Sequence, residues 1–312
     1  MRVAVIGVGC IGSVVASHFA RAGHQVTLVA RGERRDALSR EGLRVRGFSD
    51  ETFRLPIVDD VSSADAELIL VCTQMQQVDA LLSSLRSHPA AAVCLLLNAY
   101  PVPERWSETL GERLVLGFPA MLAGYRGTTV RYKTLPAWLR FVMISTLGPA
   151  RGAPAGRAKD MVRLFQSVGL ATTFSPNMES WLGSHSALVT PLLGFAVARL
   201  GRSMAMSWSD ASTLARAMHE GLAVVKRQTG RLEPLNVAAL PRIPSVAIAS
   251  VFWSLSRLPW FERAVFDYAE HARDEVRAMH AGLRSDDALP NLDRVCIGAT
   301  ARDLHVAKEI SP

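Results

Sequence analysis

Lysine is scarce in this chain of 312 residues. Of the 35 Lys and Arg residues only four are lysines, at positions 133, 159, 226 and 308, so 31 are arginines. The formal net charge is +7, but the arginines are scattered along the chain rather than gathered in blocks. Scattered arginines favour solvated helix surfaces over a nucleic-acid interface. We therefore expect no nucleic-acid partner.

Cysteine is equally scarce, and its spacing excludes two common uses. The four cysteines (Cys10, Cys72, Cys94 and Cys296) form no CxxC pair and no cluster with histidines. This spacing favours neither a disulfide framework nor a zinc site. The N-terminal residues also lack the pattern of a secretory signal. We expect a cytoplasmic protein that holds no metal.

Uncharged runs long enough to cross a membrane are nearly absent. Residues 180–198 approach the roughly 20 residues of a membrane span, but His185, a proline and several serines within them would be costly in lipid. Residues 243–256 are apolar but too short. We expect both stretches to be buried helices of a soluble core and no membrane partner. The second stretch, with Phe252 and Trp253, could instead form the interface of a homodimer.

The chain divides into two expected domains. Its length is about twice a common domain length of roughly 150 residues, and its 49% apolar composition excludes a disordered chain. In the first half, short apolar runs alternate with helical periods, which predicts a doubly wound parallel sheet in an α/β domain over residues 1–175. Helical periods alone follow, which predicts an all-helical domain over residues 176–312. The expected strands cover residues 2–7, 25–30, 68–72, 93–97 and 171–174, and the later helices cover about 178–200, 210–228, 245–255 and 261–282.

The first apolar run ends in a glycine-rich loop. A strand precedes this loop, a helical period follows it, and a second strand comes next, which is the context of the Rossmann dinucleotide fold. The first glycine allows a tight turn, the second lets a pyrophosphate approach the backbone, and the third lets the helix pack against the strand. Free N–H groups at the helix N-terminus then bind the phosphates. The loop that we expect to bind the cofactor consists of Gly7, Val8, Gly9, Cys10, Ile11 and Gly12.

The residue after the second strand predicts which dinucleotide binds. An acidic residue there would accept a hydrogen bond from a ribose 2′-hydroxyl, whereas a guanidinium can grip a 2′-phosphate through two hydrogen bonds. Here Arg31 follows the strand, and Arg34 and Arg35 add positive charge. We infer NADP rather than NAD; the alternative is that Arg31 is an ordinary surface arginine.

The chain resembles the ketopantoate reductases (2-dehydropantoate 2-reductases) over nearly its whole length. The order and spacing of the matching segments are more specific than any one of them. These segments are the opening strand with its glycine loop, Val29-Ala30-Arg31, residues 71–77 and 95–98, Leu147-Gly148-Pro149, Glu179-Ser180-Trp181, Tyr268-Ala269-Glu270 and Leu289-Pro290-Asn291. The resemblance implies a Rossmann domain, a helical domain and an active site in the cleft between them. It also implies NADPH-dependent reduction of a 2-oxo acid, in which a protein group donates a proton to the carbonyl oxygen.

Compared residue by residue, the resemblance is incomplete at the catalytic positions. The family's general-acid lysine falls on Gly183 or, with a shift of one, on Leu182, and neither can donate a proton. A second family lysine, near the cofactor and substrate, is replaced by Gln74, which can still form hydrogen bonds. The family's asparagine is kept as Asn98, and Glu270 aligns with its substrate-contacting glutamate.

Three residues are candidates for the chemistry. His185 lies four residues after Trp181 and could replace the lysine as proton donor, or it is an ordinary helix histidine. Glu270 could bind a substrate hydroxyl or pair with an arginine such as Arg273. Asn98 could orient the nicotinamide and the carbonyl or merely close a turn; its place at the carboxyl end of a parallel strand favours the first.

Two functions from different classes remain. One is an NADP-dependent 2-oxo acid reductase acting on ketopantoate or a related substrate. The other is an NADP-binding redox sensor or scaffold that has lost catalysis with the missing lysine.

Overall fold

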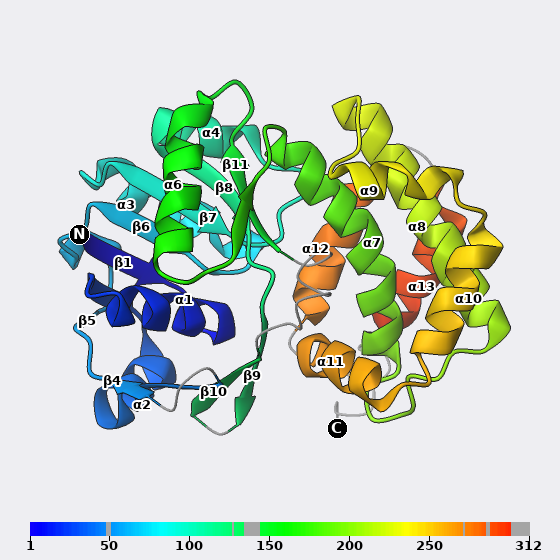
Figure 1. Cartoon of the computed structure of the whole chain (residues 1–312), viewed down its shortest axis with the longest axis horizontal. Coiled ribbons are helices and arrows are strands. Elements are labelled where there is room, and N and C mark those ends of the chain that lie inside the picture. Colours follow the sequence, from blue (N-terminus) through cyan, green and yellow to red (C-terminus); the bar gives the residue numbers. More distant parts are fainter. Residues whose placement is uncertain (48–50, 127, 134–143, 271, 285–287, 301–312) are drawn as a thin grey trace, which may run out of the picture. The chain divides into compact units, whose positions relative to one another are not determined.

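The computed structural model of the chain describes residues 1–47, 51–126, 128–133, 144–270, 272–284 and 288–300. The contacts divide the chain into two compact units, both drawn in Figure 1. Unit 1 consists of Met1–Leu97 and Val102–Met178, and unit 2 of Asn98–Pro101 and Glu179–Pro312. The division after residue 178 lies close to the boundary that we expected after residue 175. The excursion of residues 98–101 into unit 2 was not expected.

Unit 1 is built on an eight-stranded sheet with the order β12-β11-β8-β7-β6-β1-β2-β5. All neighbouring strands are parallel except β8 and β11. The central strands β6 and β7 are buried at every residue, as strands covered on both faces require. The expected α/β fold is confirmed. The strands are β1 (Arg2–Ile6), β2 (Gln25–Val29), β5 (Ile57–Val58), β6 (Leu68–Val71), β7 (Ala92–Leu96), β8 (Leu114–Phe118), β11 (Ser145–Pro149) and β12 (Thr172–Phe174).

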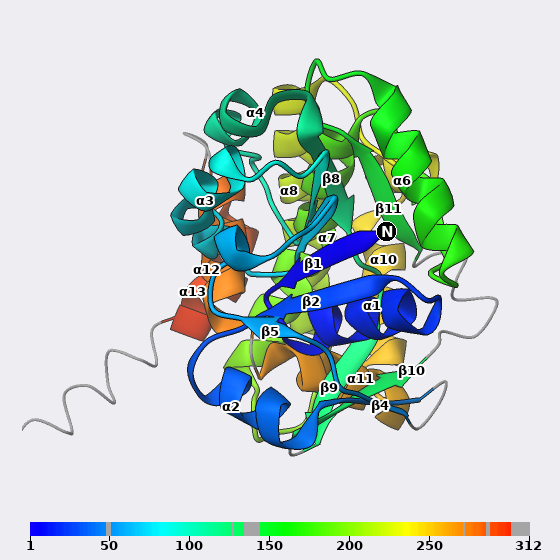
Figure 2. The same ribbon diagram turned by 90° about the vertical axis from the view of Figure 1, so that its left-hand side faces the viewer.

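Helices cover both faces of this sheet. α1 and α6 lie on one face, and α3 and α4 lie on the other (Figure 2). Phe19 of α1 meets Phe165 of α6 edge to face, with ring centroids 5.5 Å apart, in the core of the unit. This core fixes the start of α1 against the end of β1. The helices of unit 1 are α1 (Cys10–Arg21), α2 (Gly32–Glu41), α3 (Leu82–Ser87), α4 (Glu104–Leu110) and α6 (Ala155–Ser167).

Unit 1 also contains a second sheet, which the sequence analysis did not predict. Its strand order is β4-β3-β10-β9. Each strand has only three to five residues, which is a short signal in a sequence. The strands are β3 (Leu43–Arg46), β4 (Glu51–Phe53), β9 (Leu122–Arg126) and β10 (Thr129–Lys133).

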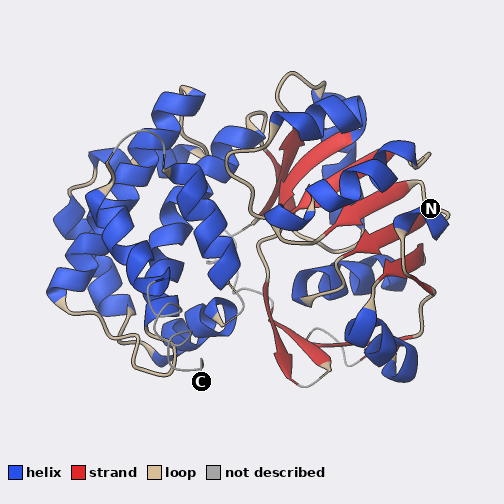
Figure 3. Cartoon of the chain, turned by 180° about the vertical axis from the view of Figure 1, so that it is seen from behind, coloured by secondary structure: helices blue, strands red, loops and turns tan. Residues whose placement is uncertain are grey.

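Unit 2 contains helices and, among its described residues, no strand (Figure 3). The expected all-helical second part is confirmed. The single helix expected over residues 261–282 is wrong, because α11 ends at Ala269 and α12 begins at Arg273. Asp274 and Glu275 in the first turn of α12 favour a new helix N-terminus there. The helices are α7 (Met178–Ala198), α8 (Trp208–Thr229), α9 (Leu235–Ala238), α10 (Ser245–Leu255), α11 (Pro259–Ala269), α12 (Arg273–Leu283) and α13 (Pro290–Thr300).

The two apolar stretches of unit 2 differ in burial. Among the described helices, α7 is long and apolar enough to cross a membrane, and 72% of its most apolar window is buried inside the protein. The expectation of a second buried helix is wrong for α10, in which only Ala249 is buried. Val246 and Val251 are 58% and 54% exposed. The helix α10 thus contains no charged residue, yet most of its side chains are not buried.

Candidate functional site

The glycines of the loop after β1 have the geometry of a phosphate-binding turn. Gly7 has a φ of +80°, which residues with a side chain rarely adopt. A Cβ at Gly12 would lie 2.3 Å from the carbonyl oxygen of Gly7, so α1 can begin this close to the turn only with glycine. A Cβ at Gly9 would meet nothing within 4 Å, so the loop is open there. The loop fits the pyrophosphate of a dinucleotide.

Positive charge lies beside this loop. The N-terminal N–H groups of α1 and the helix dipole favour an anion, and the first turn of α1 holds no acidic residue. Arg34 of α2 donates from Nε to the carbonyl oxygen of Val8 (2.7 Å) and from Nη2 to Ser13 Oγ (3.0 Å). Burial raises the pKa of the Cys10 thiol to about 11, so this side chain is neutral near pH 7. The surroundings of the loop therefore suit an anionic ligand.

Arg31 lies directly after β2, as expected, but its guanidinium already has partners. Its Nε donates to the carbonyl oxygen of Asp59 (2.7 Å) and its Nη2 to the carboxylate of Asp60 (2.8 Å). A hydrogen bond from the backbone N–H of Ser62 lowers the pKa of Asp60, so that carboxylate stays charged. The Arg31 side chain is 68% exposed. A ligand phosphate could reach Arg31, but it would compete with Asp60.

Gln74 follows β6 and begins a short turn, Met75–Gln77. Its backbone N–H donates to Gln77 Oε1 (3.1 Å), and its own Oε1 accepts from Gln76 Nε2 (2.6 Å). These bonds make Gln74 a cap of the turn. Its contact with a cofactor stays a prediction.

Residues Asn98–Pro101 leave the sheet after β7 and pack among the helices of unit 2. A Cβ at Gly183 of α7 would lie 2.5 Å from Cε2 of Tyr100, and one at Gly282 of α12 would lie 2.0 Å from the Tyr100 carbonyl oxygen. The Tyr100 hydroxyl donates to Gln228 Oε1 at 2.5 Å. Two glycines thus make room for this segment. The Tyr100 ring fills the space beside Gly183, where the resemblance would have put a lysine.

The same segment brings Asn98 next to a glutamate that the sequence analysis did not single out. Asn98 Nδ2 donates to Glu275 Oε1 (2.5 Å) and to Tyr268 Oη (3.2 Å). Tyr268 Oη lies 3.0 Å from Glu275 Oε1 and 2.8 Å from Oε2. We call these three residues the Asn98 cluster. Asn98 is only 7% exposed, and its Oδ1 has no hydrogen-bond partner in the described part of the chain. Such an atom is a candidate contact for a ligand, because buried polar atoms are normally paired.

The pKa values of both titratable groups in the Asn98 cluster, Tyr268 and Glu275, are raised. Burial raises the pKa of the Glu275 carboxyl above its usual value, although hydrogen bonds from Asn98 and Tyr268 act in the opposite direction. Burial, and then the carboxylate of Glu275, raise the pKa of Tyr268 well above its usual value. Groups whose pKa values are raised in this way are candidates for general acid catalysis.

The two other predicted catalytic residues are not hydrogen-bond partners of Asn98. Glu270 is exposed just after the end of α11, so its role stays a prediction. His185 stacks on Trp181, with ring centroids 5.4 Å apart and planes 9° from parallel. Burial lowers the pKa of His185 to about 4. The ring is therefore neutral near pH 7, and neutral imidazole is a poor acid.

Two further buried hydroxyls lie on α7. Ser186 Oγ and Thr190 Oγ1 are one helical turn apart, and neither has a hydrogen-bond partner in the described part of the chain. Like Asn98 Oδ1, they belong to unit 2. They are candidate contacts for polar groups of a ligand.

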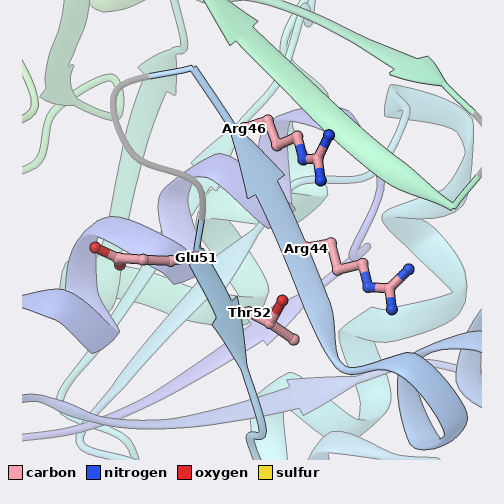
Figure 4. Close-up of a pocket in the computed structure, with 4 residues that line it drawn as sticks. All are labelled: Arg44, Arg46, Glu51 and Thr52. Atoms are coloured by element: carbon pink, nitrogen blue, oxygen red, sulfur yellow. The ribbon is translucent and has the colours of Figure 1, made fainter.

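A separate cavity of about 240 Å³ lies on the second sheet of unit 1. Figure 4 shows the four residues that line it, Arg44, Arg46, Glu51 and Thr52. Its charges are largely used within the protein, because Arg44 pairs with Glu41 and Glu51 pairs with Arg21, each at 3.1 Å. None of its lining residues belongs to the glycine loop or the Asn98 cluster. We do not assign the chemistry to this cavity.

A family model matches the part of the chain that carries the glycine loop. A family model described as Ketopantoate reductase PanE/ApbA matches residues 3–136. A 2-dehydropantoate 2-reductase of Pyrococcus horikoshii is 26% identical over 185 residues, 58% of this chain and 58% of that protein. One of Archaeoglobus fulgidus is 32% identical over 97 residues, 31% of this chain and 32% of that protein. The chain thus spans less than two thirds of either relative.

Solved structures share the fold over nearly the whole chain. The ternary structure of D-mandelate dehydrogenase with NADH and anilino(oxo)acetate has a TM-score of 0.76 at 17% identity, over 98% of this chain and 100% of that chain. A 2-dehydropantoate 2-reductase of Geobacter metallireducens has a TM-score of 0.74 at 15% identity, over 97% of this chain and 100% of that chain. At such identities the likeness shows the fold alone.

A Rossmann unit with an open glycine loop, followed by an all-helical unit, defines the class of this protein. Its N-terminal part matches one family within that class, and its whole described chain has the fold of that family's members. Residues 3–136 thus resemble the ketopantoate reductase family, and the chain as a whole is similar to that family's members in fold.

Proposed function

We propose that the protein is a cytoplasmic NADP-dependent oxidoreductase that reduces a 2-oxo acid to the 2-hydroxy acid. The observation that carries this proposal is the glycine loop, open at Gly9 and flanked by Arg31 and Arg34. The names of its relatives support the substrate class, since two are 2-dehydropantoate 2-reductases and D-mandelate dehydrogenase was solved with an oxo acid derivative. Ketopantoate is therefore the first substrate to test, and activity on it would give the protein a role in pantothenate biosynthesis.

In this proposal, residues of unit 1 bind the cofactor. The N–H groups of residues 9–12 would bind the pyrophosphate, and Arg31 would bind the 2′-phosphate by exchanging Asp60 for it. Arg34 would hold the loop in shape, and Gln74 would offer an uncharged polar contact. When bound, the reduced nicotinamide supplies a hydride to the carbonyl carbon of the substrate.

Asn98 is the first candidate among the catalytic residues. Its amide donates to the carboxyl and the phenol of its cluster, and its Oδ1, which has no hydrogen-bond partner in the described part of the chain, could hold a ligand N–H group. We propose that Asn98 orients the reacting groups. Glu270 for a substrate hydroxyl and His185 for the proton remain proposals that single variants can test.

The second candidate function is an NADP-binding sensor or scaffold without catalysis. It is favoured by the packing of Gly183 under Tyr100, which leaves no room for a lysine at that position. Such a protein would bind NADPH and turn over no 2-oxo acid.

The experiment that separates the two functions combines binding and turnover. Purified protein is titrated with NADPH and NADH by nicotinamide fluorescence and then given ketopantoate and other 2-oxo acids while nicotinamide absorbance is followed. We expect NADPH to bind more tightly than NADH and to be oxidised with at least one acid. Binding without oxidation on the whole panel would favour the sensor, and absence of binding would contradict both functions.

A further inference from the structure

We propose that Tyr268 donates the proton to the carbonyl oxygen of the substrate and that Glu275 restores it. This proposal rests on the proposed reduction of a 2-oxo acid, in which each hydride transfer needs a proton. It supplies a donor in a chain that has Gly183 where the resemblance expects a lysine. Tyr268 would touch the substrate and be catalytic, whereas Glu275 and Asn98 would act through it as positioning residues.

One arrangement of the hydrogen bonds around Tyr268 Oη makes the phenol hydrogen available to a ligand. Asn98 Nδ2 donates to Glu275 Oε1 at 2.5 Å, which leaves Oε2 to carry the carboxyl proton. Oε2 lies 2.8 Å from Oη, and Asn98 Nδ2 lies 3.2 Å from Oη. In the structure the Tyr268 hydroxyl donates to Glu275. Once Glu275 is protonated on Oε2, that bond reverses, and Oε2–H and Asn98 Nδ2 then occupy the two lone pairs of the phenol oxygen. The phenol hydrogen then points away from the cluster, toward a ligand.

The surroundings of Glu275 favour its protonated form. A buried carboxyl without a counter-ion is more stable neutral than charged. Burial is the main influence on Glu275, and its pKa is raised. Tyr268 of α11 and Asn98 are the groups in the described part of the chain that act on it, and neither carries a positive charge. The raised pKa therefore favours the protonated carboxyl, which would pass its proton to Tyr268.

Tyr268 is the accessible member of the cluster. It is 37% exposed, whereas Asn98 is 7% exposed. The break between α11 and α12 lets Tyr268, in the last turn of one helix, meet Glu275, in the first turn of the next. In one continuous helix, seven residues would separate them by about 10 Å along the axis. The break thus places the half-buried carboxyl of Glu275 beside Tyr268, the most exposed residue of the cluster.

Protons and electrons balance in the proposed reduction of the carbonyl group. The carbonyl oxygen gains the π electron pair as its carbon accepts the hydride, and it takes the proton of Tyr268 Oη. Tyr268 takes the proton of Glu275 Oε2, and Glu275 regains one from water before the next turnover. In sum, NADPH, one proton and the 2-oxo acid give NADP⁺ and the 2-hydroxy acid. The donors that face Oη stabilise the charge that develops on the phenol.

The first test is Tyr268→Phe, with Tyr132→Phe in β10 of unit 1 as the matched control. Tyr268→Phe keeps the ring but has no proton to give. We expect it to lower kcat by about 100-fold or more while the Kd for NADPH, measured by fluorescence, stays within about twofold of the wild type. Tyr132→Phe is expected to leave both quantities unchanged.

The second test is Glu275→Gln, which keeps size and hydrogen bonding but cannot pass on a proton. We expect a low kcat that no longer falls as the pH rises. A readout independent of activity is thermal stability. Because the folded-state pKa of Glu275 is raised above 4.5, its stabilising contribution is full below that pH and is lost as the pH rises through the folded value. As the pH rises above about 4.5, the Tm of the wild type should therefore fall more than that of Glu275→Gln.

Each outcome gives a distinct answer. Full turnover in Tyr268→Phe would overturn the proposal, and so would equal pH dependence of Tm in the wild type and Glu275→Gln. If Tyr268→Phe fails to fold, the pH profile and stability of Glu275→Gln decide. Lost turnover in His185→Gln together with full turnover in Tyr268→Phe would assign the donor to His185. A wild type that binds NADPH but reduces no 2-oxo acid would refute the proposed function itself, and the relay with it.

Discussion

At the scale of single residues, Arg31 is the side chain on which the choice of cofactor depends. We expect Arg31→Ala to weaken NADPH binding on the order of tenfold and to leave NADH binding unchanged, because only NADPH loses a charged hydrogen bond of about 1.5 kcal/mol or more. Arg35→Ala is the control, since Arg35 forms a similar exposed ion pair with Asp59 at 2.7 Å. Equal losses of NADPH and NADH affinity in Arg31→Ala would contradict the assigned role.

The burial of His185 should be visible in the pH dependence of stability. Its pKa is lowered from 6.5 to about 4 by burial, so between these values the unfolded chain binds a proton that the folded protein does not. Its contribution to stability is therefore full above 6.5 and falls by up to about 3 kcal/mol as the pH drops toward 4.

The variant His185→Gln removes this contribution. We expect its Tm to fall less than that of the wild type between about pH 7 and pH 5, as measured by thermal unfolding. The pKa of His18 is also lowered by burial, so it contributes equally to both proteins and cancels in the comparison. The same slope in both proteins would show that His185 is not held neutral by the fold.

At the scale of elements, two glycines in the turn from β1 into α1 should have different roles. Gly9 should matter for cofactor binding and Gly12 for the stability of the fold. Gly9→Ala should fold as well as the wild type, because its Cβ meets nothing within 4 Å, but should lose NADPH affinity because it occupies the path of the pyrophosphate. Gly12→Ala should lose stability, since its Cβ would collide with the Gly7 carbonyl oxygen. Thermal unfolding and fluorescence titration measure the two effects. An unchanged Kd in Gly9→Ala would mean that the phosphates bind elsewhere.

The sequence predicted the elements around the cofactor better than those around the Asn98 cluster. Buried parallel strands and the glycine turn leave local signatures, so β1 and β2 were expected within one residue of their ends. Residues 261–282 keep a helical period across the break between α11 and α12, and the period alone does not reveal a change of helix direction. Glu275 was therefore missed, and its neighbour Glu270 was chosen from the resemblance.

At the scale of the whole molecule, the excursion of Asn98–Pro101 into unit 2 was not expected. This segment is four residues long, and its place is set by contacts with Gly183 and Gly282, more than 80 positions later in the chain. Such contacts are not encoded in any local pattern. The exposed face of α10 was missed for a related reason, because apolar composition does not show whether another surface covers a helix.

The fate of the hydride tests the proposed reductase most directly. The protein is incubated with ketopantoate, or with whichever 2-oxo acid the panel selects, and with NADPH that carries deuterium at the transferable position of nicotinamide C4. Mass spectrometry of the product should show a 2-hydroxy acid with one deuterium on C2 for each NADPH oxidised. A product without deuterium, or NADPH that binds and is never oxidised with any 2-oxo acid, would contradict the account.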